Sequence, residues 1–231
     1  MRNPDVGEFI IYMVALIFSL SVHEAMHAWM SNRFGDDLAK HQGRISLNPV
    51  SHVDPFGTLL FPAIAFFTHA PLLGWARPTP VNPLAWRNKR VANFWVSLAG
   101  VLGNLAIAVV SGVIIIILFV TGAIVFSRET ILAAANAESP VMEGVAALLR
   151  VFFMSNVGLA VFNLFPIPPL DGSKILASIL PESFGPAIES VERFGIILLF
   201  VAMFTGVFRV VFGYVIPFAW MLVFLGVRLF T

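Results

Sequence analysis

The stretch FIIYMVALIFSLSVHEAMHAWMSNR, residues 9–33, decides what kind of fold this chain has. Its first fourteen residues carry no charge, and they are followed directly by His23, Glu24 and His27. A helix needs about 20 predominantly apolar residues to cross a bilayer. The stretch lacks the small-residue exit of a cleavable signal and carries polar chemistry inside it, so we predict a membrane helix that is retained.

The composition of the whole chain agrees with a membrane as its solvent. Of its 231 residues, 58% are hydrophobic and 12% are charged, whereas an average soluble domain carries about 25% charged residues. A net charge of +1 without a long basic run argues against nucleic acid as a partner. The absence of cysteine excludes disulfides and thiolate metal sites.

Four further stretches have few or no charges, and each is a candidate for a membrane element. They are residues 55–76, 91–127, 151–170 and 194–230. Pro62 and Pro71 interrupt the first of them, and the third is entered from about Val141. The last forms either two short spans or one long bent span. The chain is therefore predicted to be an all-α polytopic membrane protein with about five to six membrane helices.

Lysine and arginine gather in residues 33–54 and 77–90, and the positive-inside rule places both segments on the inner side. The stretch between them would then enter and leave on the same face, as a re-entrant or short extended element near the active site. Its prolines fit this topology, because broken backbone at membrane depth is tolerated where protein or water covers it. A full crossing by residues 56–70 is the competing topology.

His23 and His27 are four residues apart, so on a helix they share one face. This spacing allows two imidazole nitrogens to bind one zinc ion, and Glu24 lies where it can accept a proton from the attacking water. HExxH also occurs in solvated helices without a metal. Inside a membrane helix, water does not solvate these side chains. Ionisable groups in an apolar helix are therefore costly without a metal or a partner.

A catalytic zinc site needs a third protein ligand and one open position. The best candidate is Asp171, in the segment NLFPIPPLDG of residues 163–172. The prolines end a helix and force extended backbone near the inner face, and Gly172 permits a tight turn after the carboxylate. The alternative is an aspartate that caps a helix starting at Ser173.

HEAMH on a first membrane helix, with NLFPIPPLDG on a later one, resembles the site-2 protease family of intramembrane zinc metalloproteases. The similarity is to its short members without PDZ or CBS domains and covers about residues 8–180. Supporting stretches are GRISLNP (43–49), HVDPFGT (52–58), GWARP (74–78) and SLAG (97–100). One departure is Val101, where many relatives carry proline, which puts local helix geometry in question.

The resemblance implies that His23, His27 and Asp171 hold zinc, one ion per chain, and that Glu24 is the general base. It also suggests that Asn163 helps to position the scissile carbonyl or its oxyanion, although Asn163 could instead be an interhelical clamp. We expect one transmembrane metalloprotease domain over residues 1–231, with a catalytic core at about 8–180 and C-terminal membrane helices at about 190–230.

The function expected is that of a zinc-dependent endopeptidase that cuts in or near the transmembrane segment of another membrane protein, in regulated intramembrane proteolysis. Its partners would be that substrate and the lipid bilayer, with no nucleic acid. The protein would lie in the cell membrane as a multi-pass protein with its active site toward the cytoplasm.

Two other functions remain open. A metal-ion transporter could use the same His/Asp cluster, but it predicts polar residues along a path to both faces. Toward the outer side the sequence offers only Asn104, Ser111, Ser155 and Asn156, of which Asn104 is interpreted as a helix-packing residue and Asn156 as a clamp. A catalytically silent scaffold is disfavoured because a structural zinc site has no need of Glu24.

Overall fold

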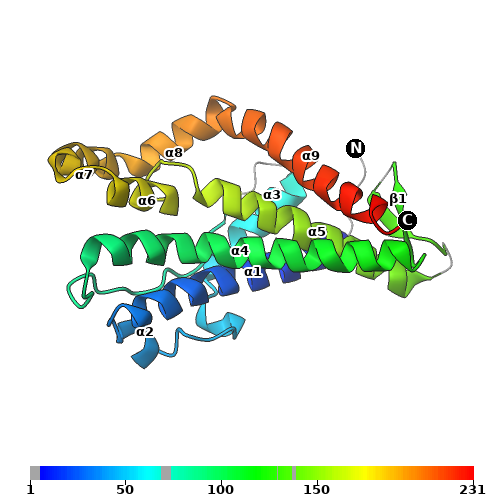
Figure 1. Cartoon of the computed structure of the whole chain (residues 1–231), viewed down its shortest axis with the longest axis horizontal. Helices are drawn as coiled ribbons and strands as arrows, with labels where there is room; N and C mark the ends of the chain where they lie inside the picture. Colours follow the sequence, from blue (N-terminus) through cyan, green and yellow to red (C-terminus); the bar gives the residue numbers. More distant parts are fainter. Residues whose placement is uncertain (1–5, 69–73, 129, 137–138) are drawn as a thin grey trace.

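The computed structural model describes residues 6–68, 74–128, 130–136 and 139–231 (Figure 1). Four helices in this part of the chain are long and apolar enough to cross a membrane: α1 (Val6–Arg33), α4 (Lys89–Val120), α5 (Pro140–Asn163) and α9 (Val207–Arg228). At 1.5 Å per residue even α9 is about 33 Å long, which exceeds the roughly 30 Å of a hydrocarbon core. The first stretch and the stretches at 91–127, 151–170 and 194–230 each contribute one of these four helices, and the shorter apolar helices Pro55–Thr68 and Gly195–Phe204 accompany them.

The remaining elements are short. They are α2 (Leu38–His41), η1 (Pro49–Ser51), η2 (Pro55–Leu60), α3 (Phe61–Thr68), β1 (Ile124–Ser127), β2 (Ile131–Ala134), α6 (Asp171–Ile179), η3 (Glu182–Phe184), α7 (Gly185–Arg193) and α8 (Gly195–Phe204). Among the described residues the strands form one antiparallel hairpin. The prediction of an all-α polytopic membrane protein is confirmed.

Helix α4 lies at the centre of the bundle and packs against α1, α5, α6 and α9 (Figure 1). Helices in lipid associate through close packing rather than through the hydrophobic effect, so small side chains favour their contact. The buried face of α4 carries such residues: Ala92, Ala99, Gly100, Gly103, Ala108 and Gly112. The helix runs without a break through the buried Val101, so the missing proline does not disturb it.

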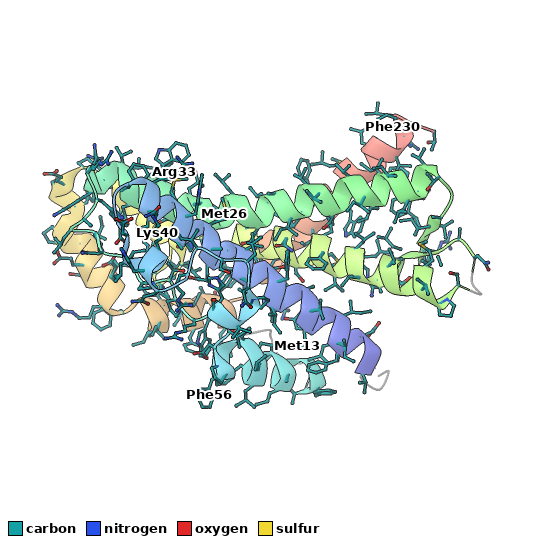
Figure 2. All side chains as sticks on the ribbon, turned by 90° about the horizontal axis from the view of Figure 1, so that it is seen from below. Met13, Met26, Arg33, Lys40, Phe56 and Phe230 are labelled. Carbon is teal, nitrogen blue, oxygen red and sulfur yellow. The ribbon has the colours of Figure 1, made fainter. Side chains whose placement is uncertain are left out.

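The two ends of the helix bundle carry different elements and different side chains. Helices α2, α6 and α7 lie at one end, and the hairpin and the C-terminus lie at the other (Figure 1). Figure 2 shows Arg33 and Lys40 at the first end, opposite Phe230. At the second end, Ile124 and Leu132 of the hairpin are buried in the core that α4, α5 and α9 share. The hairpin therefore closes the end remote from the basic residues.

The two ends of the proline-interrupted stretch, residues 55–76, lie next to each other. Helices η2 and α3 form a continuous segment that runs along α1, where the rings of Phe66 and Phe9 are 5.3 Å apart. The Trp75 N–H then donates to the Gly57 carbonyl at 3.1 Å, beside the start of the same segment. This is what a re-entrant element requires and a full crossing does not. Residues 69–73, which connect the two parts of the stretch, lie outside the described residues.

The last apolar stretch forms two helices, and only one of them has spanning length. Helix α8 has ten residues, which makes it about 15 Å long and too short to cross. It is separated from α9 by Thr205 and by Gly206, whose φ of 79° is in the left-handed region that glycine adopts without penalty.

Candidate metal centre

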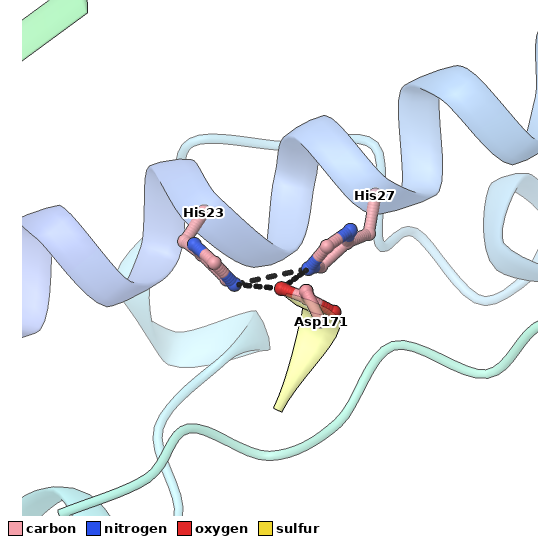
Figure 3. A group of neighbouring side chains, drawn as sticks. All are labelled: His23, His27 and Asp171. Atoms are coloured by element: carbon pink, nitrogen blue, oxygen red, sulfur yellow. Dashed lines mark hydrogen bonds and ion pairs between the residues drawn. The ribbon is translucent and has the colours of Figure 1, made fainter. Parts of the chain in front are cut away.

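Helix α1 continues without a break through the HEAMH motif, so His23 and His27 lie on one face as predicted. Their Nε2 atoms are 3.0 Å apart and converge on the same point (Figure 3). The two residues are 5% and 9% exposed. Both imidazoles are therefore removed from bulk solvent and need a partner at Nε2.

Asp171 reaches this pair from the first turn of α6 (Figure 3). Its Oδ2 atom lies 3.1 Å from Nε2 of His23 and 3.2 Å from Nε2 of His27. Its other oxygen lies 3.8 Å from the ammonium of Lys174. The alternative of a capping aspartate does not describe it, because α6 begins at Asp171 itself and its N-cap position is Leu170.

The chemistry of the three converging atoms fits a divalent metal ion. They lie within 4.8 Å of one another. His27 Nδ1 is 2.7 Å from the Val96 carbonyl, which can only accept, so Nδ1 carries a proton, and in the neutral ring Nε2 keeps the lone pair that a metal needs. His23 Nδ1 lies 2.7 Å from Oδ1 of Asn104. Two imidazoles and one carboxylate form a donor set that occurs in catalytic zinc sites.

Val96, Gly100 and Asn104 follow each other at four-residue spacing on α4, and this matches the spacing of the two histidines on α1. Gly100 lies between the two ring partners, and a Cβ there would lie 2.5 Å from Nε2 of His27 and 2.6 Å from Cε1 of His23. The histidine rings therefore fit only against a glycine. The interpretation of Asn104 as a packing residue was incomplete, because its side chain binds a ring of the site.

Glu24 is half-buried beside the histidines, and Thr79 holds it there. The Thr79 N–H donates to Oε2 of Glu24 at 2.7 Å, and the Thr79 hydroxyl donates to the Glu24 carbonyl at 2.9 Å. Thr79 belongs to the segment that leads away from the re-entrant stretch. Two bonds from one residue thus fix both the backbone and the carboxylate of Glu24.

Arg44 in turn fixes the segment that carries Thr79. Its guanidinium donates to two backbone carbonyls, one of which belongs to Pro78. Burial and the nearby Arg77 lower the pKa of Arg44, and Glu24 opposes that shift. An arginine stays protonated at neutral pH even so, which places a buried cation close to the site. Neither Thr79 nor Arg44 was predicted as a site residue, although both lie in or beside the stretches that carry the resemblance.

Helix α6 is held in place at both of its ends. Arg90 of α4 donates to the carbonyls of residues 178–180 at 2.6 to 2.9 Å, where the end of a helix leaves carbonyls without partners. At the other end, a Cβ on Gly172 would overlap the carbonyls of Leu164 and Phe165, which follow the end of α5. Gly172 is helical, so its role is close approach to this backbone and not the tight turn that the sequence suggested.

Asn163, the last residue of α5, stands apart from this group. Its Nδ2 donates to the Leu159 carbonyl one turn earlier at 2.9 Å. Among the described residues, no hydrogen bond joins it to the histidines or to Asp171. Its role stays a prediction. Asn156 is confirmed as an interhelical clamp, because it bonds to side chains of both α1 and α4.

The family described as Peptidase family M50 matches residues 11–207. A protein of Bacillus subtilis (strain 168) named "Putative zinc metalloprotease YwhC" is 35% identical over 193 residues, which cover 84% of this chain and 80% of that protein. No solved structure gives a significant match.

Two mycobacterial proteins named "Putative zinc metalloprotease Rip2" are also similar. The protein from Mycolicibacterium smegmatis is 28% identical, over 87% of this chain and 69% of its own length. The protein from Mycobacterium tuberculosis is 29% identical, over 84% of this chain and 67% of its own length. The family match spans the whole stretch from the two histidines to Asp171.

Proposed function

This chain belongs to peptidase family M50, and from that premise we propose that it is a zinc-dependent intramembrane endopeptidase. Its substrate would be the transmembrane segment of another membrane protein, cut in or near that segment in regulated intramembrane proteolysis. The names of the similar proteins, which call them zinc metalloproteases, support the choice of metal. The four helices of spanning length support the setting in lipid.

The observation that carries the proposal is the convergence of one Asp171 oxygen on two imidazole nitrogens, at 3.1 and 3.2 Å. His23 lies ten residues before Arg33, the last residue of α1, which is about 15 Å along the helix axis. A reaction at this centre would therefore take place below the membrane surface. A substrate helix keeps its peptide bonds in its own hydrogen bonds, so it must be locally unwound before attack.

The residues take their roles from where they lie. His23, His27 and Asp171 would hold zinc and leave one coordination position open. When bound, zinc supplies Lewis acidity that activates water and polarises a carbonyl. Glu24 would take a proton from the attacking water and return it to the leaving amine. The Thr79 N–H occupies Oε2, which leaves Oε1 of Glu24, without a hydrogen bond from a described residue, to carry that proton.

Asn163 would donate a hydrogen bond to the scissile carbonyl or its oxyanion. A carboxamide has two N–H donors, and the Leu159 carbonyl accepts from the Nδ2 group of Asn163, so one donor remains for substrate. We assign residues 1–231 to one domain, with its catalytic core at about 8–180 and C-terminal membrane helices at about 190–230.

The active site would open toward the cytoplasm. Basic residues gather near the end of the bundle that carries α2 and α6, and the positive-inside rule favours the cytoplasm for that end. They include Arg33, Lys40, Arg44, Arg77, Arg87, Lys89 and Arg90. Water would reach the metal centre from this side.

The test compares the wild type with Glu24→Gln, both purified in detergent, for zinc content and for cleavage of a helical membrane substrate. The expected result is full zinc content in both proteins and a loss of cleavage by about 10²- to 10⁴-fold in Glu24→Gln, the usual contribution of a general base. Equal cleavage by the two proteins would remove Glu24 from the mechanism.

Metal flux in liposomes without proteolysis would instead favour a transporter. The structure offers little for such a path, because Asn104 and Asn156, two of the few polar residues toward the outer side, bond to each other at 2.9 Å. Both are fully buried.

A further inference from the structure

We propose that Asn104 is a positioning residue for His23, and that Asn156 and Ser19 orient it through a directed chain of buried hydrogen bonds. The inference rests on the proposed function, because it treats His23 as a metal ligand. From the sequence, Asn104 was interpreted as a helix-packing residue and Asn156 as a clamp, and Ser19 was given no role.

The chain of hydrogen bonds passes through three membrane helices. Oδ1 of Asn104 on α4 lies 2.7 Å from Nδ1 of His23 on α1. Nδ2 of Asn104 donates to Oδ1 of Asn156 on α5 at 2.9 Å. Nδ2 of Asn156 donates to Oγ of Ser19 on α1 at 2.8 Å, and that hydroxyl donates to the Ala15 carbonyl at 2.6 Å. Each link is of ordinary hydrogen-bond length.

Backbone carbonyls, which can only accept, set the direction of this chain. The Phe152 carbonyl takes a second N–H of Asn156 at 2.8 Å, so the Asn156 amide cannot turn over without losing donors on that side. The oxygen of Asn156 must then face Asn104, which presents its own NH₂ group there. The Ser19 carbonyl, 3.3 Å from Nδ2 of Asn104, favours the same orientation.

The orientation of the Asn104 amide determines the tautomer of the His23 imidazole. Because the NH₂ group of Asn104 is committed, its oxygen faces His23 and accepts from Nδ1–H. The neutral ring of His23 is thus held in the tautomer that keeps a lone pair on Nε2, the atom that would bind the metal. A partner at the outer nitrogen of a metal-binding histidine fixes the ring and its tautomer in this way.

His27 differs in one respect that makes the inference testable. Its Nδ1 donates to the Val96 backbone carbonyl, which no side-chain substitution removes. Of the two histidines, it is His23 whose ring orientation depends on a side chain of α4. Ser19, Asn104 and Asn156 are each 0% exposed, so water cannot replace a missing partner without opening the bundle.

The simplest competing explanation is that these residues only clamp three helices together, as buried amides do in lipid. Asn104→Asp separates the two explanations. A carboxylate keeps an acceptor for His23 Nδ1–H but loses the donor to Asn156, so it spares the ring partner and breaks the clamp. Asn104→Leu removes both.

The experiment measures Zn²⁺ affinity by competition with a chelator in the full-length protein without substrate. It is combined with the visible spectrum of the Co²⁺ form and with thermal unfolding of the metal-free form. We expect Asn104→Leu to weaken zinc binding by about 10- to 100-fold, the usual cost of removing an outer partner. The effect should be smaller in Asn156→Leu and smallest in Ser19→Ala, and Asn104→Asp should recover most of the affinity and the wild-type Co²⁺ spectrum.

A ¹⁵N spectrum of labelled histidine adds a readout that requires no metal. The metal-free wild type should show His23 protonated at Nδ1, and Asn104→Leu should show mixed tautomers. Wild-type affinity and spectra in a folded Asn104→Leu protein would overturn the inference and leave the proposed function intact. The same holds if Asn104→Asp loses as much affinity as Asn104→Leu. A wild type that binds no zinc would overturn the proposed function, and this inference with it.

Discussion

Gly100 offers a direct test of how α4 shapes the metal centre. The substitution Gly100→Ala adds one methyl group, which on the observed backbone lies 2.5 Å from Nε2 of His27 and 2.6 Å from Cε1 of His23. Ordinary contacts between carbon atoms are about 3.5–4.0 Å, so one or both rings must move by roughly 1 Å. The nitrogen atoms that would bind zinc move with the rings.

A movement of this size is large for a metal site, where ligand distances hold to within about 0.2 Å. Changes that merely loosen a ligand from outside weaken metal binding by about 10- to 100-fold. We therefore expect Gly100→Ala to weaken zinc binding by at least about 100-fold, or about 2.8 kcal/mol. The extra methyl also costs roughly 1–3 kcal/mol of folding stability through overpacking, so stability must be measured separately.

The assay is chelator competition for Zn²⁺, with thermal unfolding of the metal-free protein recorded alongside. Gly112→Ala is the matched control, because it lies on the same helix and its added Cβ would come no closer than 3.4 Å to any atom. The control should bind zinc as the wild type does. If Gly100→Ala folds and also binds zinc with wild-type affinity, the idea that this glycine makes room for the histidine rings is refuted.

Three further predictions follow from the same contacts. Thr79→Pro removes the N–H that holds Glu24 and should lower kcat by about 10-fold or more at unchanged zinc content, whereas Thr79→Val keeps that N–H and should stay closer to the wild type in the same cleavage assay. Gly172→Ala places a Cβ against the Leu164 carbonyl, so its yield of folded protein should fall sharply, and a wild-type yield would contradict the close approach of α6 to the backbone that follows α5. Removing zinc by a chelator should lower the unfolding temperature, since a ligand at 1,000 times its Kd contributes about 4 kcal/mol; zinc should restore it in the wild type but not in Asp171→Ala.

The convergence of the three proposed ligands was predictable because each rests on a local rule. Four-residue spacing on a helix brings His23 and His27 to one face whatever surrounds them. The prolines before Asp171 end one helix, and a carboxylate after a long apolar stretch has few places to go in lipid. The structure brings these two pieces together, with Asp171 in the first turn of α6 and not before a tight turn.

Other features depend on contacts between helices, which periodicity does not encode. The uncharged run of residues 91–127 looked like one span, but α4 ends at Val120 and residues 124–127 form a strand. Hydropathy alone does not separate a buried strand from the end of a helix. The interpretation of Asn104 was incomplete for a related reason. It does lie on the buried face of α4 with glycine and alanine, but the ring that its side chain contacts lies on α1, more than eighty residues away.

Helix α4 supplies none of the proposed metal ligands. It nevertheless contacts both histidines and the helix that carries Asp171. The Val96 carbonyl and the Asn104 side chain bind the outer nitrogens of the two histidines. Arg90 of the same helix binds the carbonyls that end α6, the helix on which Asp171 sits. One helix, α4, thus positions the ligands that α1 and α6 carry. A small shift of α1 relative to α6 is limited because both helices are held against α4. The geometry of this site therefore depends on α4, and substitutions at Arg90, Gly100 and Asn104 should alter metal binding even though none of these residues would touch the ion.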